Sequence, residues 1–270
     1  MNKKLLLSLI LIGVFVLSSC TQKKTLPIKP PKHGGVYVVA HRGAHLEEQI
    51  PENSIPAYQK AIDIGADFVE IDVRMTKDGK FVSCHNSEVG KYVVGGHPGK
   101  ISEMTLAEIK QLDIGSRVSE KWKGTQIPTF DEILDLCKGK IGIYLDLKNA
   151  PVEPLIEKIR ARGMEQDVLW YADNVELEEV KSNCSKCVIM PDPGPEKNLV
   201  PLIERFHPDV IAAVWKYMSA SFMTVSHDAG AIVIVDDGGP ESWQQALDWG
   251  LDGIQSDHPA ELIKFLENRK

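Results

Sequence analysis

Charged and polar residues stand in, or directly after, several short apolar runs of this 270-residue chain. They comprise two histidines, three carboxylates and two cations: His41, Arg42, Glu70, Asp72, His85, Asp146 and Lys148. Histidines can take and give protons near neutral pH, whereas a metal ion and cationic side chains neutralise the charge of a phosphoryl group. Together these residue types have the chemistry that cleavage of a phosphodiester requires.

Glu70 and Asp72 are two residues apart in one apolar run, so in a strand both side chains point to the same face. Asp146 ends a later run and can approach them at the same height. Three carboxylates at one edge repel each other unless a hard divalent cation lies between them. We therefore predict one bound Mg²⁺ or Ca²⁺ with Glu70, Asp72 and Asp146 as ligands. The alternative is that Arg42 and Lys148 neutralise the carboxylates as structural ion pairs.

The apolar run that ends at His85 follows the Glu70 run after a connection too short for a crossover helix. This connection contains Lys77-Asp78-Gly79, a strong signal for a tight hairpin. We expect the two runs to pair antiparallel, which would place His85 opposite Asp72 or Glu70.

Short β-branched runs alternate with helical patterns from residue 36 onward, which is typical of repeated βα units. The predicted strands are Val36–Ala40, Phe68–Val73, Lys80–His85, Ile141–Leu147, Val168–Ala172, Cys187–Pro191, Asp209–Trp215, Ala231–Asp236 and Gly253–Ser256. Without the hairpin strand, eight parallel strands remain, as in a TIM (β/α)8 barrel. A doubly wound open sheet is the alternative fold. In a TIM barrel the active site lies at the carboxyl ends of the strands.

Amphipathic patterns predict helices between most of these strands. They include Ser54–Ile64, Thr129–Cys137, Pro151–Arg162, Val175–Ser182 and Glu241–Trp249. The stretch from about 86 to 127 is long, rich in Gly, Ser and Lys, and has one good helical pattern, Thr105–Asp113. We expect an insertion there, close to the barrel mouth.

The chain resembles the glycerophosphodiester phosphodiesterase family through a series of motifs in the same order and spacing. The series is His41-Arg42-Gly43, Pro51-Glu52-Asn53-Ser54, residues 65–73 (GADFVEIDV), Thr76-Lys77-Asp78-Gly79, His85, residues 104–110, residues 127–130, residues 253–257 and Pro259. One such motif would mean little, but the ordered series is highly specific and covers nearly the whole chain after the leader.

The resemblance implies a TIM-barrel enzyme with His41 and His85 as its acid–base pair. It also implies that Glu70, Asp72 and Asp146 hold the metal ion, that Arg42 and Lys148 face the phosphate, and that Glu52 supports the substrate-binding rim. Asn53 or Ser54 is expected to cap the helix that follows.

The chain departs from the family pattern in three places. Asn86 stands where the family usually has Asp, and an amide cannot hold a neighbouring group by charge. Asp146 stands where Glu is usual, which puts metal affinity in question. Residues 234–238 replace a common tryptophan-containing motif, so substrate preference cannot be transferred through that position.

The first residues are typical of a bacterial lipoprotein signal peptide. Lys3 and Lys4 precede the apolar run Leu5–Leu17, which is too short for a membrane span of about twenty residues. The run ends in Ser18-Ser19-Cys20, which resembles a lipobox. We expect residues 1–19 to be removed and Cys20 to be lipidated, giving an exported protein anchored to a membrane of the cell envelope.

Residues 20–35 contain several prolines and lysines and little apolar periodicity, which predicts a flexible tether before a domain spanning 36–270. The net charge of −7 disfavours nucleic acid as a partner. Cys184 and Cys187 can form a local disulfide or remain as two thiols, and Cys84 and Cys137 are assigned to packing.

These observations favour hydrolysis of glycerophosphodiesters, the deacylated phospholipid headgroups, to an alcohol and sn-glycerol 3-phosphate. An altered barrel that binds phosphorylated envelope ligands without turnover is the alternative. A third hypothesis is an enzyme acting on intact lipids, which requires an exposed apolar rim. The insertion, with Trp122 as its only tryptophan, offers little sign of such a rim.

Overall fold

The structure, a computed structural model, describes residues 26–96 and 99–269. The predicted signal peptide and Cys20 lie outside these residues.

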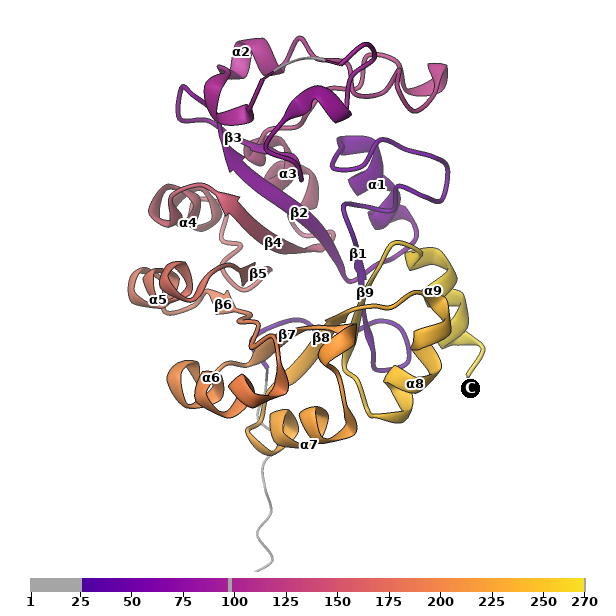
Figure 1. Cartoon of the computed structure of the whole chain (residues 1–270), viewed down its shortest axis with the longest axis vertical. Coiled ribbons are helices and arrows are strands. Elements are labelled where there is room, and N and C mark those ends of the chain that lie inside the picture. Colours follow the sequence, from indigo (N-terminus) through magenta and orange to yellow (C-terminus); the bar gives the residue numbers. More distant parts are fainter. Residues whose placement is uncertain (1–25, 97–98, 270) are drawn as a thin grey trace, which may run out of the picture.

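In the described part of the chain eight parallel strands form the barrel. Figure 1 shows how they are arranged. They are β1 (Tyr37–Ala40), β2 (Phe68–Met75), β4 (Gly142–Asn149), β5 (Val168–Tyr171), β6 (Val188–Ile189), β7 (Val210–Val214), β8 (Ile232–Asp236) and β9 (Gly253–Ser256). Their order is β6-β5-β4-β2-β1-β9-β8-β7. Between β6 and β7 the ring is bridged by the Ala212 amide, which donates to the Pro191 carbonyl over 3.0 Å. The predicted TIM-type barrel is confirmed.

The extra strand β3 (Phe81–Ser83) pairs antiparallel with β2, as predicted from the hairpin signal. Its register pairs Val73 with Ser83, and the Cys84 amide then donates to the Asp72 carbonyl over 2.9 Å. The predicted pairing of His85 with Asp72 or Glu70 is therefore wrong. β3 ends at Ser83, so His85 is presented by the loop that follows the strand.

Helices cover the outside of the barrel (Figure 1). They are α1 (Ile55–Asp63), α3 (Phe130–Cys137), α4 (Val152–Arg160), α5 (Asn174–Asn183), α6 (Leu199–Phe206), α7 (Ala220–Asp228), α8 (Trp243–Asp248) and α9 (Pro259–Glu267). Their apolar faces pack on the outward side chains of the strands and form the main core. Within the described residues no helix has the length and apolar character needed to cross a membrane.

The insertion after β3 packs over the end of β2 and β3 and has a small core of its own (Figure 1). Its helix α2 (Leu106–Ile109) is capped by Thr105 and Glu108 in a capping box. The helix ends at Ile109 and is therefore shorter than the predicted Thr105–Asp113, because Asp113 instead accepts the backbone N–H groups of Gly115 and Ser116.

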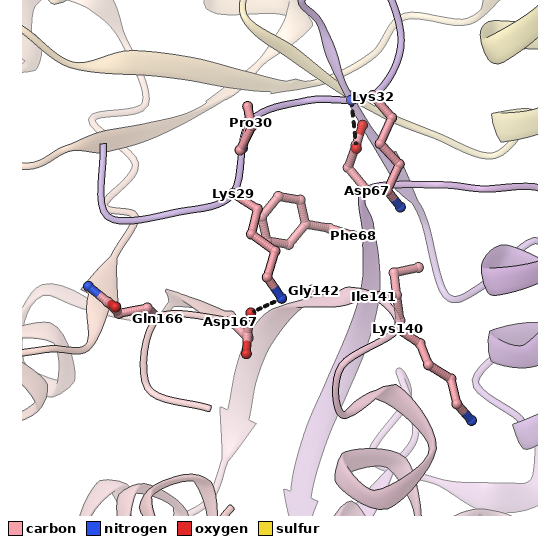
Figure 2. A pocket seen from close by; sticks show the side chains of 10 residues that line it. All are labelled: Lys29, Pro30, Lys32, Asp67, Phe68, Lys140, Ile141, Gly142, Gln166 and Asp167. Atoms are coloured by element: carbon pink, nitrogen blue, oxygen red, sulfur yellow. Dashed lines mark hydrogen bonds and ion pairs between the residues drawn. The ribbon is translucent and has the colours of Figure 1, made fainter. Parts of the chain in front are cut away.

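The segment before β1 lies against the floor of the barrel, at the amino ends of the strands. Ile28 is buried and packs with the side chains inside the barrel, and the Tyr37 hydroxyl donates to the Lys29 carbonyl. Figure 2 shows the Lys32 amide bonded to Asp67 and the Lys29 ammonium paired with Asp167 at this end. For residues 26–35 these contacts replace the flexible tether predicted over 20–35.

The cysteines of the described chain fall into two groups. Cys184 and Cys187 form a disulfide between α5 and β6, which decides between the two alternatives left by the sequence. Cys84 and Cys137 are free and buried, in agreement with their assignment to packing.

Candidate active site

A cavity of about 200 Å³ opens at the carboxyl ends of the strands. Its lining includes seven residues selected from the sequence: His41, Arg42, Glu70, Asp72, His85, Asp146 and Lys148. Glu52 is not among the lining residues. Its carboxylate lies 3.3 Å from Arg42 Nη1, so it positions Arg42, and its part in substrate binding stays a prediction. The structure thus brings both histidines, the three carboxylates and the two cations together.

The three carboxylates converge from two neighbouring strands. β2 and β4 are parallel with Asp72 opposite Asp146, and Glu70 projects to the same face two residues before Asp72. One oxygen from each residue lies within 4.8 Å of the others. Glu70 and Asp72 are almost completely buried, with exposed fractions of 2% and 1%. The convergence follows from strand register, because carboxyl ends of parallel strands meet at one end of the barrel.

The charged forms of these three carboxylates are unfavourable without a nearby cation. Burial raises the pKa of Glu70 well above its ordinary value, and the charge of Asp72 raises it further. Burial also raises the pKa of Asp146, although the Lys148 ammonium opposes that shift. Concentrated buried negative charge needs a cation close by.

Two cations are present but do not neutralise the whole cluster. Lys148 Nζ lies 2.6 Å from Asp146 Oδ2 and 3.2 Å from Asp72 Oδ1, whereas Arg42 Nε is 3.9 Å from Asp72 Oδ2. In the described chain no cationic side chain pairs with Glu70, which accepts only the Arg42 amide, over 2.7 Å. The structural ion-pair alternative is therefore observed only in part.

A divalent metal ion fits the remaining capacity of the cluster. The donor atoms are all carboxylate oxygens, which Mg²⁺ and Ca²⁺ prefer. Asp72 Oδ1 is buried, and the Lys148 ammonium at 3.2 Å is the one partner that it has within the described chain. Glu70, Asp72 and Asp146 could therefore hold one divalent cation.

His41 is oriented by a carboxylate that follows the last strand. Its Nδ1 lies 2.7 Å from Asp257 Oδ1. Burial alone lowers the His41 pKa, but the hydrogen bond to Asp257 and the charge of Glu70 outweigh it and raise the pKa to about 9. The imidazolium form of His41 is therefore favoured at neutral pH, with Nε2 free to give a proton. No local sequence pattern links Asp257 to His41.

His85 has a neutral partner instead. Its Nδ1 lies 3.0 Å from the Asn86 side-chain oxygen, and Asn86 in turn is held by the Tyr92 hydroxyl. Arg74 fixes the loop by donating from Nη2 to the His85 carbonyl over 2.5 Å. An amide oxygen accepts the Nδ1 proton without stabilising the imidazolium by charge. The two histidines thus differ in their partners, one a carboxylate and the other an amide.

A tight turn after β1 places Arg42 in the site. Arg42 has a φ of 52°, in the left-handed region, and Gly43 has a φ of 85°. A Cβ added to Gly43 would lie 2.7 Å from the Ala57 side chain, so only glycine fits there. This backbone conformation aims the Arg42 amide at Glu70, which explains why the His-Arg-Gly sequence accompanies a carboxylate on β2.

Asn53 holds the buried Asp72 in place. It too has a positive φ, of 50°, and its Nδ2 donates to Asp72 Oδ2 over 2.8 Å. Its Oδ1 accepts the Tyr58 hydroxyl, also over 2.8 Å. Ser54 is the residue that caps α1, by accepting the Ala57 amide. The sequence predicts Asn53 only as a possible helix cap. Its contact with Asp72 was not predicted, although Asn53 lies in the Pro51–Ser54 motif.

Similar solved structures share this fold. A glycerophosphodiester phosphodiesterase from Agrobacterium tumefaciens aligns with a TM-score of 0.74 and 24% identity over 85% of this chain and 99% of that one. A phosphodiesterase from Oleispira antarctica, solved in complex with the product sn-glycerol-3-phosphate, aligns with a TM-score of 0.73 and 25% identity over 86% of this chain and 96% of that one.

Curated relatives match over a shorter stretch. A glycerophosphodiester phosphodiesterase from Caldanaerobacter subterraneus subsp. tengcongensis is 36% identical over 152 residues, which is 53% of this chain and 61% of the relative. One from Bacillus subtilis is 32% identical over 58% of this chain and 56% of the relative. The chain thus spans between half and two thirds of the length of these relatives.

The family comparison covers the part of the chain that carries most of the site. Residues 41–176 match the "Glycerophosphoryl diester phosphodiesterase family". This range begins at His41 and contains the three carboxylates, His85 and Lys148. On this match and the shared barrel, the chain belongs to the glycerophosphoryl diester phosphodiesterase family.

Proposed function

We propose that the protein hydrolyses glycerophosphodiesters to an alcohol and sn-glycerol 3-phosphate in a reaction that depends on a divalent cation. The observation that carries the proposal is one cavity with His41, His85 and the Glu70–Asp72–Asp146 cluster in its wall. The names of the relatives and the product complex of the Oleispira antarctica phosphodiesterase support the same substrate class.

Glu70, Asp72 and Asp146 would hold the cation. When bound, it supplies neutralisation of the charge on the phosphoryl oxygens. Arg42 and Lys148 line the same cavity and add two further positive charges on the phosphate side. Glu52 keeps the Arg42 guanidinium in position through their ion pair.

We infer the roles of the two histidines from their partners. His41 is protonated through Asp257 and gives its proton to the oxygen of the leaving alcohol, which would otherwise depart as an alkoxide. His85, with the uncharged Asn86 on Nδ1, would take the proton from the attacking oxygen through Nε2. One histidine is therefore the acid and the other the base.

The test is release of sn-glycerol 3-phosphate from glycerophosphoethanolamine and glycerophosphocholine, with Mg²⁺, Ca²⁺ or a chelator. Metal-dependent release that is lost in His41→Ala would support the proposal. Absence of turnover with either substrate and either metal, in a protein that still binds a divalent cation, would favour the alternative of a barrel that binds phosphorylated ligands. Asn86 and Asp146, where the chain departs from the family pattern, would then be examined first.

We also propose that Cys20 is lipidated and anchors the exported protein to a membrane of the cell envelope. The leader and its Ser18-Ser19-Cys20 ending support this. Residues 26–35 lie at the barrel floor, so an anchor at Cys20 would join the barrel at the end opposite the cavity. The cavity would then face away from the bilayer, which suits a small water-soluble substrate.

Fractionation of cells that produce the whole chain tests the anchor. The protein should be found with membranes and incorporate a labelled fatty acid, and Cys20→Ser should abolish both. Absence of label in the unaltered protein would contradict lipidation, and membrane association that persists in Cys20→Ser would contradict Cys20 as the anchor.

A further inference from the structure

Gln255 is a buried polar residue in the wall of the cavity. It lies on β9 with an exposed fraction of 6% and lines the same cavity as His41 and Glu70. The neighbouring inward positions, Val39 and Ile234, are apolar and belong to the core inside the barrel. A glutamine buried at this position therefore needs hydrogen-bond partners.

The Gln255 side chain satisfies only one of its two polar ends within the described chain. Asp236 is its register partner on β8, so the two side chains are neighbours in the cavity wall; burial raises the pKa of the Asp236 carboxyl group, and the nearby Gln255 amide opposes that shift. A carboxylate only accepts hydrogen bonds, so the NH₂ end of Gln255 must face Asp236. The carbonyl end, Oε1, is buried and has no partner in the described chain. A buried acceptor without a donor is unfavourable, and a bound ligand with an N–H or O–H group would satisfy it.

The position of the Asp236–Gln255 pair relative to the rest of the site indicates which part of the substrate it would contact. The strand order β4-β2-β1-β9-β8 puts the carboxylate cluster on one side of β1 and the Asp236–Gln255 pair on the other. His41, at the end of β1, lies between them and is the acid that protonates the leaving oxygen in the proposed reaction. The leaving alcohol therefore extends from His41 toward β9 and β8.

The negative charge of Asp236 favours one kind of leaving alcohol. No lysine or arginine lies within ion-pair distance of Asp236 in the described structure; burial raises the pKa of its carboxyl group, and the charge of His41 opposes that shift. The two neighbouring carboxylates have other partners. Asp237 accepts the Trp243 indole N–H, and Asp257 accepts His41. An unpaired carboxylate beside a free carbonyl oxygen matches a group that has both positive charge and N–H donors.

We propose that Asp236 and Gln255 form a subsite that binds the leaving alcohol and prefers one with a primary ammonium group, such as ethanolamine. The inference rests on the proposed phosphodiesterase function. A quaternary ammonium such as choline has the charge but no N–H donor, so it leaves Gln255 Oε1 unsatisfied. The subsite therefore discriminates between two cationic headgroups of the same charge.

The experiment compares kcat/KM for glycerophosphoethanolamine and glycerophosphocholine in the holoenzyme with Mg²⁺. The unaltered protein should prefer the ethanolamine substrate about tenfold, the size expected for one hydrogen bond to a partly charged pair. Gln255→Met, which keeps the length of the side chain and removes its polar atoms, should bring the ratio close to one. Gln245→Met, at an exposed position of α8, is the matched control and should keep the ratio.

Binding provides a readout that does not need turnover. The dissociation constants of phosphoethanolamine and phosphocholine are measured by calorimetry with Mg²⁺, in the unaltered protein, in Gln255→Met and in Asp236→Asn. A Gln255-dependent preference for phosphoethanolamine without any hydrolysis would support the subsite and contradict the proposed activity. Normal hydrolysis with an unchanged substrate ratio in Gln255→Met would overturn the subsite.

One further result would also overturn it. If Gln255→Met weakens binding of sn-glycerol 3-phosphate and leaves the two headgroup phosphates alike, the glycerol part and not the leaving alcohol occupies this wall. Thermal unfolding of each variant shows whether the barrel is intact. If Gln255→Met does not fold, the comparison is made with Asp236→Asn, because Asp236 is solvent-accessible. A ratio of kcat/KM for the two substrates that is unchanged in Asp236→Asn would then contradict the proposal.

Discussion

Two histidine–aspartate pairs flank strand β9, one at each end of the barrel. At the mouth, His41 Nδ1 lies 2.7 Å from Asp257, and at the floor His227 Nε2 lies 2.8 Å from Asp252. Asp252 also accepts the Val233 amide over 2.9 Å, so the floor pair ties a helix to the sheet. The mouth pair instead faces a cavity, next to carboxylates that lack enough cations. The same pair of side chains stabilises the fold at one end and prepares proton transfer at the other.

The surroundings of the two pairs differ in the same way. The floor is covered by residues 26–35, and its charged groups have protein partners: the Lys29 ammonium pairs with Asp167, and the Asp67 carboxylate accepts the Lys32 backbone amide (Figure 2). At the mouth Glu70, Asp72 Oδ1 and Gln255 Oε1 are left with unused hydrogen-bonding or charge capacity. In TIM barrels the carboxyl ends of the strands serve function and the amino ends serve stability. Unused polar capacity is thus concentrated where a ligand can bind.

Alanine substitution of the two histidines should give the largest difference in activity between the mouth and the floor of the barrel. We expect His41→Ala to lower kcat/KM for glycerophosphoethanolamine by about 10²–10⁴-fold, the usual contribution of a positioned acid–base group. His227→Ala should keep the activity close to that of the unaltered protein, because His227 lies at the other end of the barrel. Steady-state kinetics of the two variants side by side provide the measurement. Equal losses in both would remove the distinction between the pairs.

The carboxylate partners should differ in their effect on pH dependence. Burial lowers the His41 pKa, but the hydrogen bond to Asp257 and the charge of Glu70 raise it to about 9, so the protonated acid and the activity are present below that pH and are lost as pH rises through it. In Asp257→Asn the pKa falls toward its ordinary value, and the alkaline loss of activity should move to lower pH. At pH 8 the rate should fall by at most about thirtyfold, the loss for a full return to the ordinary pKa. A pH–rate profile of Asp257→Asn that coincides with that of Asp252→Asn would contradict the role of Asp257.

The floor should control stability. Ile28 is buried against the core inside the barrel, so Ile28→Ala should lower the free energy of unfolding by about 2 kcal/mol, at the low end for a buried isoleucine. Val175→Ala, at a 73% exposed residue near the mouth, is the control and should change it little. Denaturant titration gives both values. If Ile28→Ala has no effect on unfolding, residues 26–35 do not stabilise the barrel.

The ion pair of Lys29 with Asp167 should have the smallest effect. Lys29 is largely exposed, with 73% of its side chain accessible, and exposed pairs contribute less than about 1 kcal/mol. Lys29→Met should therefore change the unfolding free energy by less than Ile28→Ala and become indistinguishable from the unaltered protein at high salt. A larger loss than that of Ile28→Ala would show that charge and not apolar burial holds the segment to the floor.

Sequence patterns were sufficient for the barrel and for most of the site because the signals involved are local. β-Branched runs predict strands such as β2, and Lys77-Asp78-Gly79 predicts the hairpin that makes β3 antiparallel. Parallel strands then bring residues at their carboxyl ends to one rim without further information. His41, Glu70 and Asp146 meet for this reason.

Contacts that depend on tertiary packing were beyond sequence patterns. Asp257 reaches His41 only because β9 pairs with β1, and Asn53 reaches Asp72 only through its left-handed backbone conformation. The Pro- and Lys-rich composition of residues 20–35 suggests a free tether, yet Ile28 finds an apolar hollow that exists only in the closed barrel. The predicted pairing of His85 with Asp72 or Glu70 is wrong for the same reason, since strand pairing stops at Ser83.

The most direct test of the contrast between the two ends is thermal unfolding of the protein with increasing Mg²⁺ or Ca²⁺. If Glu70, Asp72 and Asp146 bind a divalent cation, the melting temperature should rise as the cation saturates the site, and Glu70→Gln should abolish the rise. Asp252→Asn, at the floor, should melt earlier but retain the full response to the cation. A response that is the same in the unaltered protein and in Glu70→Gln, or no response to either cation, would contradict a metal site at the mouth of this barrel.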